Sequence, residues 1–268
     1  MRDQAYFRDR AEGEMKFNLP ENNFSKREAL AITCQILASE GHESGLAGQI
    51  TARDDLAQHF LTLRFGYGFD EASESLIVQV DDDLKSTQVG AMANLATRFH
   101  LWVYRARPDV QAIVHTHPPF TSALTMIGEP LKVGHMDSTM LSGQVAHLKD
   151  WPGLPVADEE GRIISQALGD KKAILLAHHG LLTTGTTIQE ACYMAVFFER
   201  AARAQLRAMS AGIVREVEAK LADEAGSFLR QASIVNATFA YWARRLKIGG
   251  LVQDQVDVAL GSAGVPRT

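Results

Sequence analysis

A chain of 268 residues with 46% hydrophobic and 22% charged residues has the composition of an ordinary globular protein, long enough for one large α/β domain or two small ones. Its net charge of −5 and the lack of a Lys/Arg block argue against a nucleic-acid partner, and no apolar window is long enough to span a bilayer. The charged N-terminus without a signal-peptide core, and two cysteines in helix-like patterns, predict a cytoplasmic protein with reduced thiols.

The first quarter of the chain predicts a helix followed by strands. Ser25 and Glu28 form a capping box, apolar residues then recur at helical spacing, and Gly41 ends the helix. Strand-like stretches follow at 45–53, 59–65 and 75–80.

The remaining elements alternate between helix and strand. Pro108 closes a helix that begins at Asn94, and a strand over 110–117 and a short helix over 119–128 come next. After an irregular segment, Glu129 to Pro155, we expect a helix over 158–170, a buried strand over 171–180, a long helix over 188–211 opened by a Thr187–Glu190 capping box, and a helical C-terminus with a weak tail. This interleaving without a linker predicts one layered α/β domain with a helical C-terminal extension.

Two histidine motifs end apolar strands. In "AIVHTHPPF", His115 and His117 are two apart and share a strand face. In "AILLAHHGLL", His178 and His179 are adjacent and face opposite ways, so only one of them can join the pair. Three neutral imidazoles at strand ends are a known way to hold a divalent metal with one position open, whereas a single such histidine is commonly structural.

"FHLWVYRARPDVQAIVHTHPP", "AILLAHHGLLTTG" and "IQEACYMAVFFERAARAQL" resemble the class II aldolase/adducin family, over about Glu28 to Met209. The resemblance implies a three-layer α/β/α domain at 25–210 with a central mixed, mainly antiparallel sheet, between an N-terminal arm (1–24) and a helical extension (211–268). It implies that His115, His117 and His179 bind a divalent metal (Zn, Mn, Fe or Co), while His178 faces away and packs. It also implies a homotetramer with sites between subunits. Glu199, Arg200 and Arg203 are expected on the solvated or subunit-facing side of the long helix.

The chain departs from the family's sugar-phosphate aldolases where they bind phosphate. A gap-free comparison puts "GQIT" (Gly48 to Thr51), Phe65-Gly66 and Asn94-Leu95 at those positions, and two of the three elements lack their hydroxyls. We therefore expect a small anionic substrate other than a sugar phosphate, with Gln49, Phe65 and Asn94 as substrate-binding residues.

The acid–base residues of those aldolases also differ here. Ala96 stands in place of a glutamate beside the metal, and Met136 in place of a proton-donating tyrosine from a neighbouring subunit. Decarboxylation needs only one proton donor, for which His135, oriented by Asp137, is the candidate; alternatively both residues only satisfy loop backbone. "GLAGQITAR" and "GFDE" are similar to decarboxylases of hydroxylated aromatic or heteroaromatic dicarboxylates, such as hydroxypyridine dicarboxylate and dihydroxyphthalate.

The leading hypothesis is thus a metal-dependent carbon–carbon lyase that acts as a decarboxylase. Three alternatives stay open: an aldolase for an unphosphorylated hydroxy-carbonyl compound, an Fe(II) oxygenase that uses the same three histidines, and a non-catalytic adducin-like assembly module. The adducin branch lacks the metal histidines, so their presence here counts against the last alternative.

Overall fold

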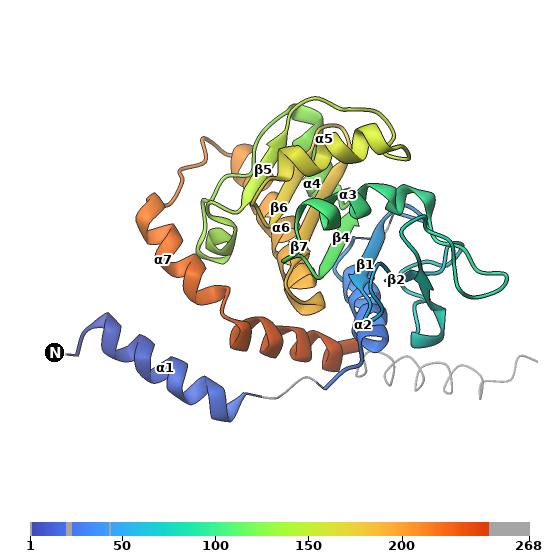
Figure 1. The fold of residues 1–268 in the computed structure, drawn as a ribbon. Coiled ribbons are helices and arrows are strands. Elements are labelled where there is room, and N and C mark those ends of the chain that lie inside the picture. The colour runs from blue at the N-terminus through green and yellow to red at the C-terminus, as the bar shows by residue number, and fades with distance from the viewer. Residues whose placement is uncertain (1, 20–22, 43, 247–268) are drawn as a thin grey trace, which may run out of the picture.

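A seven-stranded sheet forms the centre of the computed structural model, which describes residues 2–19, 23–42 and 44–246 (Figure 1). The strand order is β3-β2-β1-β4-β7-β6-β5. Only β5 and β6 pair in parallel, so the predicted mixed, mainly antiparallel sheet is confirmed. The strands are β1 (Gln49–Arg53), β2 (Phe60–Leu63), β3 (Ile77–Val80), β4 (Ala112–Thr116), β5 (Val145–Leu148), β6 (Ala173–Leu176) and β7 (Gly180–Gly185).

Helices cover both faces of this sheet. Strand β4 illustrates why, because its side chains alternate between the faces: Ala112 and Val114 belong to one apolar core, and Ile113 belongs to the other. The first core is completed by α2 (Lys26–Ser39) and α6 (Ile188–Met209), and the second by α3 (Arg98–Ala106) and α5 (Asp158–Leu168). The predicted α/β/α layering is confirmed.

The N-cap hydrogen bond of each predicted capping box is present at the start of its helix. The Ser25 hydroxyl accepts a hydrogen bond from the Glu28 amide at 3.1 Å at the start of α2, and Thr187 accepts one from the Glu190 amide at 3.1 Å at the start of α6. The shorter helices are α4 (Pro119–Ile127) and the 3₁₀ helices η1 (Glu74–Leu76), η2 (Leu95–Thr97) and η3 (Met136–Leu141).

Two strands were not predicted. The strand expected over 171–180 ends at Leu176, and Gly180 begins the separate strand β7. Strand β7 was missed because its threonines make the segment look polar in the sequence. Thr183 and Thr184 are nevertheless buried, and the Thr183 hydroxyl donates a hydrogen bond to the Ala191 carbonyl at 2.8 Å. Strand β5 lies within the segment expected to be irregular.

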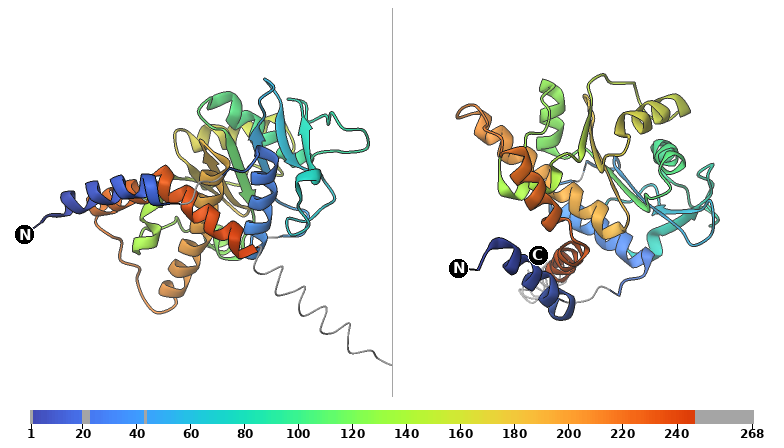
Figure 2. Two further views of the ribbon diagram at one scale, coloured as in Figure 1. Left: turned by 90° about the horizontal axis from the view of Figure 1, so that it is seen from below. Right: turned by 60° about the vertical axis from the view of Figure 1, so that its left-hand side comes forward.

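Both flanking segments contain helices. The N-terminal arm contains α1 (Gln4–Asn18), which lies beside the C-terminal helical residues 232–246 (Figure 2). Gln231, the residue before that helix, donates a hydrogen bond to the Glu12 carboxylate at 2.6 Å. Helix α7 (Ala219–Leu229) precedes them. The weak tail expected after residue 247 lies outside the described residues. Among the described helices, none has both the length and the apolar character to cross a membrane.

Candidate metal centre

His115, His117 and His179 converge where β4 ends and the chain turns from β6 into β7. Their candidate ligand nitrogens all lie within 4.8 Å of one another, and their ring centroids are 4.5, 4.7 and 4.8 Å apart. The Nε2 atoms of His115 and His117 are 2.9 Å apart. The sequence expectation that one histidine of the second motif joins the first pair is therefore borne out by the geometry.

The sheet itself orients His115. Its Nδ1 lies 2.7 Å from the carbonyl oxygen of Leu181 on β7, to which it donates, so its Nε2 carries the lone pair that faces the other two histidines. The ring is buried, and its position is fixed by an edge-on contact with Phe99 at 4.9 Å.

Gly180 explains why glycine follows the two histidines. A Cβ atom there would lie 2.4 Å from the Thr116 carbonyl oxygen and 2.9 Å from Cδ2 of His117, so only glycine lets β7 pass this close. His178 does not pack as expected. It is exposed, in a left-handed conformation (φ 52°), and outside the cluster.

Burial favours the neutral form of all three clustered imidazoles. Burial, reinforced by the neighbouring histidines, holds the pKa of His115 well below its usual value. Burial also lowers the pKa of His117, and burial followed by the effect of His117 lowers the pKa of His179 to about 4.

This donor set fits a divalent metal ion. Nitrogen ligands at the usual Zn–N distance in a tetrahedral site are about 3.4 Å apart. Here the distance between Nε2 of His115 and Nε2 of His117 is 2.9 Å, and all the ligand nitrogens lie within 4.8 Å of one another. Small shifts of the rings would therefore bring all three lone pairs onto one ion. Within the described residues, no carboxylate belongs to this group.

Glu199 on α6 holds the start of α4, the helix that follows His117, a role that the sequence analysis missed. Its carboxylate accepts hydrogen bonds from the Phe120 amide, the Thr121 amide and the Thr121 hydroxyl, at 2.9, 2.8 and 2.7 Å, which caps α4 two residues after His117. Glu199 is 5% exposed and its partners lie within its own chain, so the expected solvated or subunit-facing position is wrong for Glu199. Burial outweighs these bonds and raises its pKa. The signal in the sequence was its position between the apolar residues Phe198 and Ala202.

Gln49, Phe65 and Asn94 line one small cavity of about 20 Å³. Gln49 is the cross-strand partner of His115, so the two side chains share a face of the sheet, and its buried Oε1 has no hydrogen-bond partner. Asn94 is engaged locally, because its Nδ2 donates to the Leu46 carbonyl and its Oδ1 accepts from the Ala96 amide.

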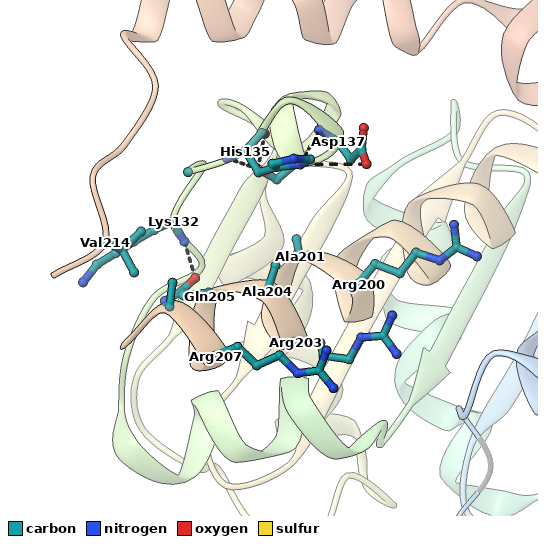
Figure 3. Close-up of a pocket in the computed structure, with 13 residues that line it drawn as sticks. Lys132, His135, Asp137, Arg200, Ala201, Arg203, Ala204, Gln205, Arg207 and Val214 are labelled. Atoms are coloured by element: carbon teal, nitrogen blue, oxygen red, sulfur yellow. Dashed lines mark hydrogen bonds and ion pairs between the residues drawn. The ribbon is translucent and has the colours of Figure 1, made fainter. Parts of the chain in front are cut away.

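His135 lies elsewhere. It caps η3, where its Nδ1 accepts a hydrogen bond from the Asp137 amide at 3.1 Å, and it lines a separate cavity beside α6 (Figure 3). Within the described part of the chain, no contact joins it to the three histidines. The Asp137 carboxylate is 3.8 Å from Nδ1, so the backbone of Asp137, rather than its carboxylate, orients the ring.

Comparisons with known proteins agree with this architecture. "Decarboxylase NovR" of Streptomyces niveus is 32% identical over 67% of this chain and 68% of that protein. A "3,4-dihydroxyphthalate decarboxylase" of Arthrobacter keyseri is 28% identical over 80% and 93%. A "4-hydroxy-3-prenylphenylpyruvate oxygenase/4-hydroxy-3-prenylbenzoate synthase" of Streptomyces roseochromogenus subsp. oscitans is 31% identical over 70% and 69%.

A solved structure, "L-fuculose 1-phosphate aldolase from Glaciozyma antarctica PI12", superposes with a TM-score of 0.76 at 31% identity and covers 83% of this chain and 88% of that chain. The family model "Class II Aldolase and Adducin N-terminal domain" matches residues 28–206. With this match over most of its length, and with the α/β/α fold around the histidine group, the chain belongs to the class II aldolase and adducin family.

Proposed function

We propose that this protein is a metal-dependent carbon–carbon lyase that decarboxylates a small hydroxylated aromatic or heteroaromatic carboxylate. The convergence of His115, His117 and His179, with nitrogens within 4.8 Å of one another, carries the proposal. The family contains both decarboxylases and aldolases, which supports lyase chemistry in general.

The three histidines would hold Zn, Mn, Fe or Co, because each of these divalent ions accepts imidazole ligands. When bound, such an ion supplies a Lewis acid that polarises a substrate oxygen and offsets negative charge on the substrate. The chain's own contribution is to present three neutral donors and to fix the His115 ring through the Leu181 carbonyl.

The side chains of Gln49, Phe65 and Asn94 would recognise a hydroxylated aromatic compound at the edge of this small cavity. Gln49 Oε1 is a buried acceptor without a partner, so it would bind a substrate hydroxyl rather than a phosphate, which needs donors. Phe65, on the same cavity, would give an aromatic ring an apolar wall, and Asn94 would shape that wall.

His135 is our candidate for the proton donor. Loss of CO₂ leaves an electron pair on the substrate carbon, which must take up one proton. His135 Nδ1 accepts a hydrogen bond from the Asp137 amide, so Nε2 is the ring nitrogen that would deliver the proton, and the side chain is 68% exposed. We propose that it reaches the histidine group of a neighbouring subunit in a homotetramer.

Metal content of the protein purified without chelator is the first test. We expect about one equivalent of divalent metal per chain, greatly reduced in His179→Ala because deleting one of three ligands weakens binding sharply. His178→Asn is the matched control, since it changes the adjacent, exposed histidine and suits the left-handed backbone. Equal metal content in wild type and His179→Ala, or no metal in the wild type, would contradict the proposal and favour the adducin-like alternative.

The reaction is tested by following CO₂, aldehyde and O₂ with hydroxylated aromatic carboxylates, starting with 3,4-dihydroxyphthalate. Release of CO₂ without O₂ consumption, lost in His179→Ala but kept in His178→Asn, is the expected result. Aldehyde release from a hydroxy-carbonyl compound would identify an aldolase. Bound iron with strict O₂ dependence would identify an oxygenase, the second candidate, which the oxygenase relative favours.

A further inference from the structure

A cavity lies away from the three histidines, against the long helix α6. It measures about 500 Å³, a volume typical of small-molecule sites. Helix α6 forms one side, and the segment Lys132–Ser138 and Val214 form the others (Figure 3). The Val217 amide donates to the Val133 carbonyl at 2.8 Å, which ties the chain after α6 to this wall.

More cationic than acidic side chains line the cavity, although the chain carries a net charge of −5. Four cationic side chains line it, and Asp137 is the one carboxylate among its lining residues. The cationic residues are Lys132, Arg200, Arg203 and Arg207.

Two of these four cations are already paired with carboxylates outside the cavity lining. Arg200 bonds Glu40 at 2.7 Å, and Lys132 bonds Glu129 at 3.0 Å. Arg203 and Arg207 form no ion pair with any described residue, and both are exposed.

The nearest acid does not neutralise them. Glu199 interacts electrostatically with Arg203, but its carboxylate is buried and bound to three donors at the start of α4. Arg207 instead lies over the Phe120 ring, with its guanidinium carbon 6.0 Å from the ring centre. Both guanidinium groups therefore keep free hydrogen-bond donors.

Helical spacing brings these like charges together. Arg200 and Arg203 are three residues apart, and Arg203 and Arg207 are four apart, so they are neighbours on one helix face, where like charges repel and destabilise. In Figure 3, Arg203 and Arg207 extend to the same side of α6, beside α4, and His135 lies on the opposite wall. A bound anion would relieve this repulsion.

We propose that this cavity binds a small organic polyanion, a molecule with at least two carboxylate or phosphate groups, at a site separate from the histidine group of the same chain. One anionic group would take the bidentate donors of Arg203 and Arg207, whose planar guanidinium groups match carboxylate and phosphate oxygens. A second would lie toward the Lys132 ammonium on the other wall. A molecule with two anionic groups spans both walls, whereas a single-charge anion reaches only one.

Calorimetric titration of the full chain with tricarballylate and with fructose 1,6-bisphosphate tests the proposal, with chloride at equal ionic strength as the baseline. Arg203→Gln/Arg207→Gln removes the unpaired charges. Arg105→Gln/Arg162→Gln is the matched control, because it removes two charges from partly exposed arginines outside the cavity. His179→Ala separates this site from the metal centre.

We expect the wild type to bind at least one of the two anions more tightly than chloride. The cavity variant should bind at least about tenfold more weakly, because it loses charge-assisted hydrogen bonds. The control and His179→Ala should stay within about twofold of the wild type. The preferred anion tells carboxylate from phosphate, and either preference supports the site.

Three results would overturn the proposal: no binding beyond chloride, an equal loss in the control pair, or a loss in His179→Ala, which would place the anion at the histidines. If circular dichroism shows the double variant unfolded, Arg203→Gln and Arg207→Gln are judged singly by the same criterion. Binding is measured without turnover, so a failure of the decarboxylase proposal leaves this test unaffected.

Discussion

Gly180 is the position where one added methyl group should disturb both the sheet and the histidine group. In Gly180→Ala, the new Cβ would lie 2.4 Å from the Thr116 carbonyl oxygen, which is backbone and cannot rotate away. Relieving the clash requires β7 to move from β4 by roughly 1 Å, since carbon contacts are optimal near 3.5 Å. That movement also stretches the 2.7 Å hydrogen bond from His115 to the Leu181 carbonyl.

The expected cost combines two effects. Overpacking a well-packed interior costs about 1–3 kcal/mol, and a lost hydrogen bond about 1 kcal/mol, so we expect Gly180→Ala to lose about 2–4 kcal/mol of unfolding free energy. Because the bond that orients His115 is weakened, we expect metal affinity to fall by about 10- to 100-fold. Urea unfolding in chelator measures the first effect, and competition with a chromophoric chelator measures the second.

Gly13→Ala is the matched control, because Gly13 lies within α1 and a Cβ there meets nothing within 4 Å. It should leave metal affinity unchanged and stabilise the protein by up to about 1 kcal/mol, since alanine favours helix. The reasoning is refuted if Gly180→Ala matches Gly13→Ala in both stability and metal affinity.

Two further predictions concern buried titratable groups. Burial lowers the pKa of His100 to about 3, below the ordinary value of 6.5. Between these two values the unfolded chain binds a proton that the folded chain does not, so the free energy of unfolding decreases as the pH is lowered below 6.5. Urea unfolding in chelator at pH 6 and pH 5 should therefore show a loss about 1 kcal/mol smaller in His100→Asn than in wild type; equal losses would contradict this. Burial also raises the pKa of the Cys34 and Cys192 thiols, so Ellman's reagent should react with neither in the native protein and with both in guanidinium chloride, and fast native reaction would be the contrary result.

Local patterns sufficed for the elements whose signals lie within a few residues. Capping boxes at Ser25 and Thr187 marked the starts of α2 and α6, because the bonds concerned join residues three apart. The period of two in a strand was enough to align His115 with His117, and the opposed faces of His178 and His179 limited the third member to one of them.

The rest depended on contacts between distant parts of the chain. Glu199 was expected on the solvated or subunit-facing side of the long helix, but its partners are the amides of Phe120 and Thr121, 79 and 78 residues away. The position of His135 depends likewise on how η3 packs, which no local pattern states. Strand β7 was not predicted because threonines in a segment indicate exposure. Here the Thr183 hydroxyl is buried because it donates its hydrogen bond to the carbonyl of Ala191, which belongs to α6.

The two proposed binding positions share a physical property that packing alone does not explain. The buried Oε1 of Gln49 has no partner, and an unpaired buried acceptor costs about 1–3 kcal/mol, which an apolar side chain of similar size would avoid. Arg203 and Arg207 likewise repel each other, which a neutral residue at either position would relieve. Both sets line cavities, and local rules of stability are broken mainly where a site needs the offending group. The Gln49 Oε1 atom lacks a partner that donates a hydrogen bond to it, whereas, among the described residues, Arg203 and Arg207 lack partners that accept hydrogen bonds from them. The same reasoning therefore assigns the two positions different ligands: a hydroxyl beside the histidines, and an anion beside α6.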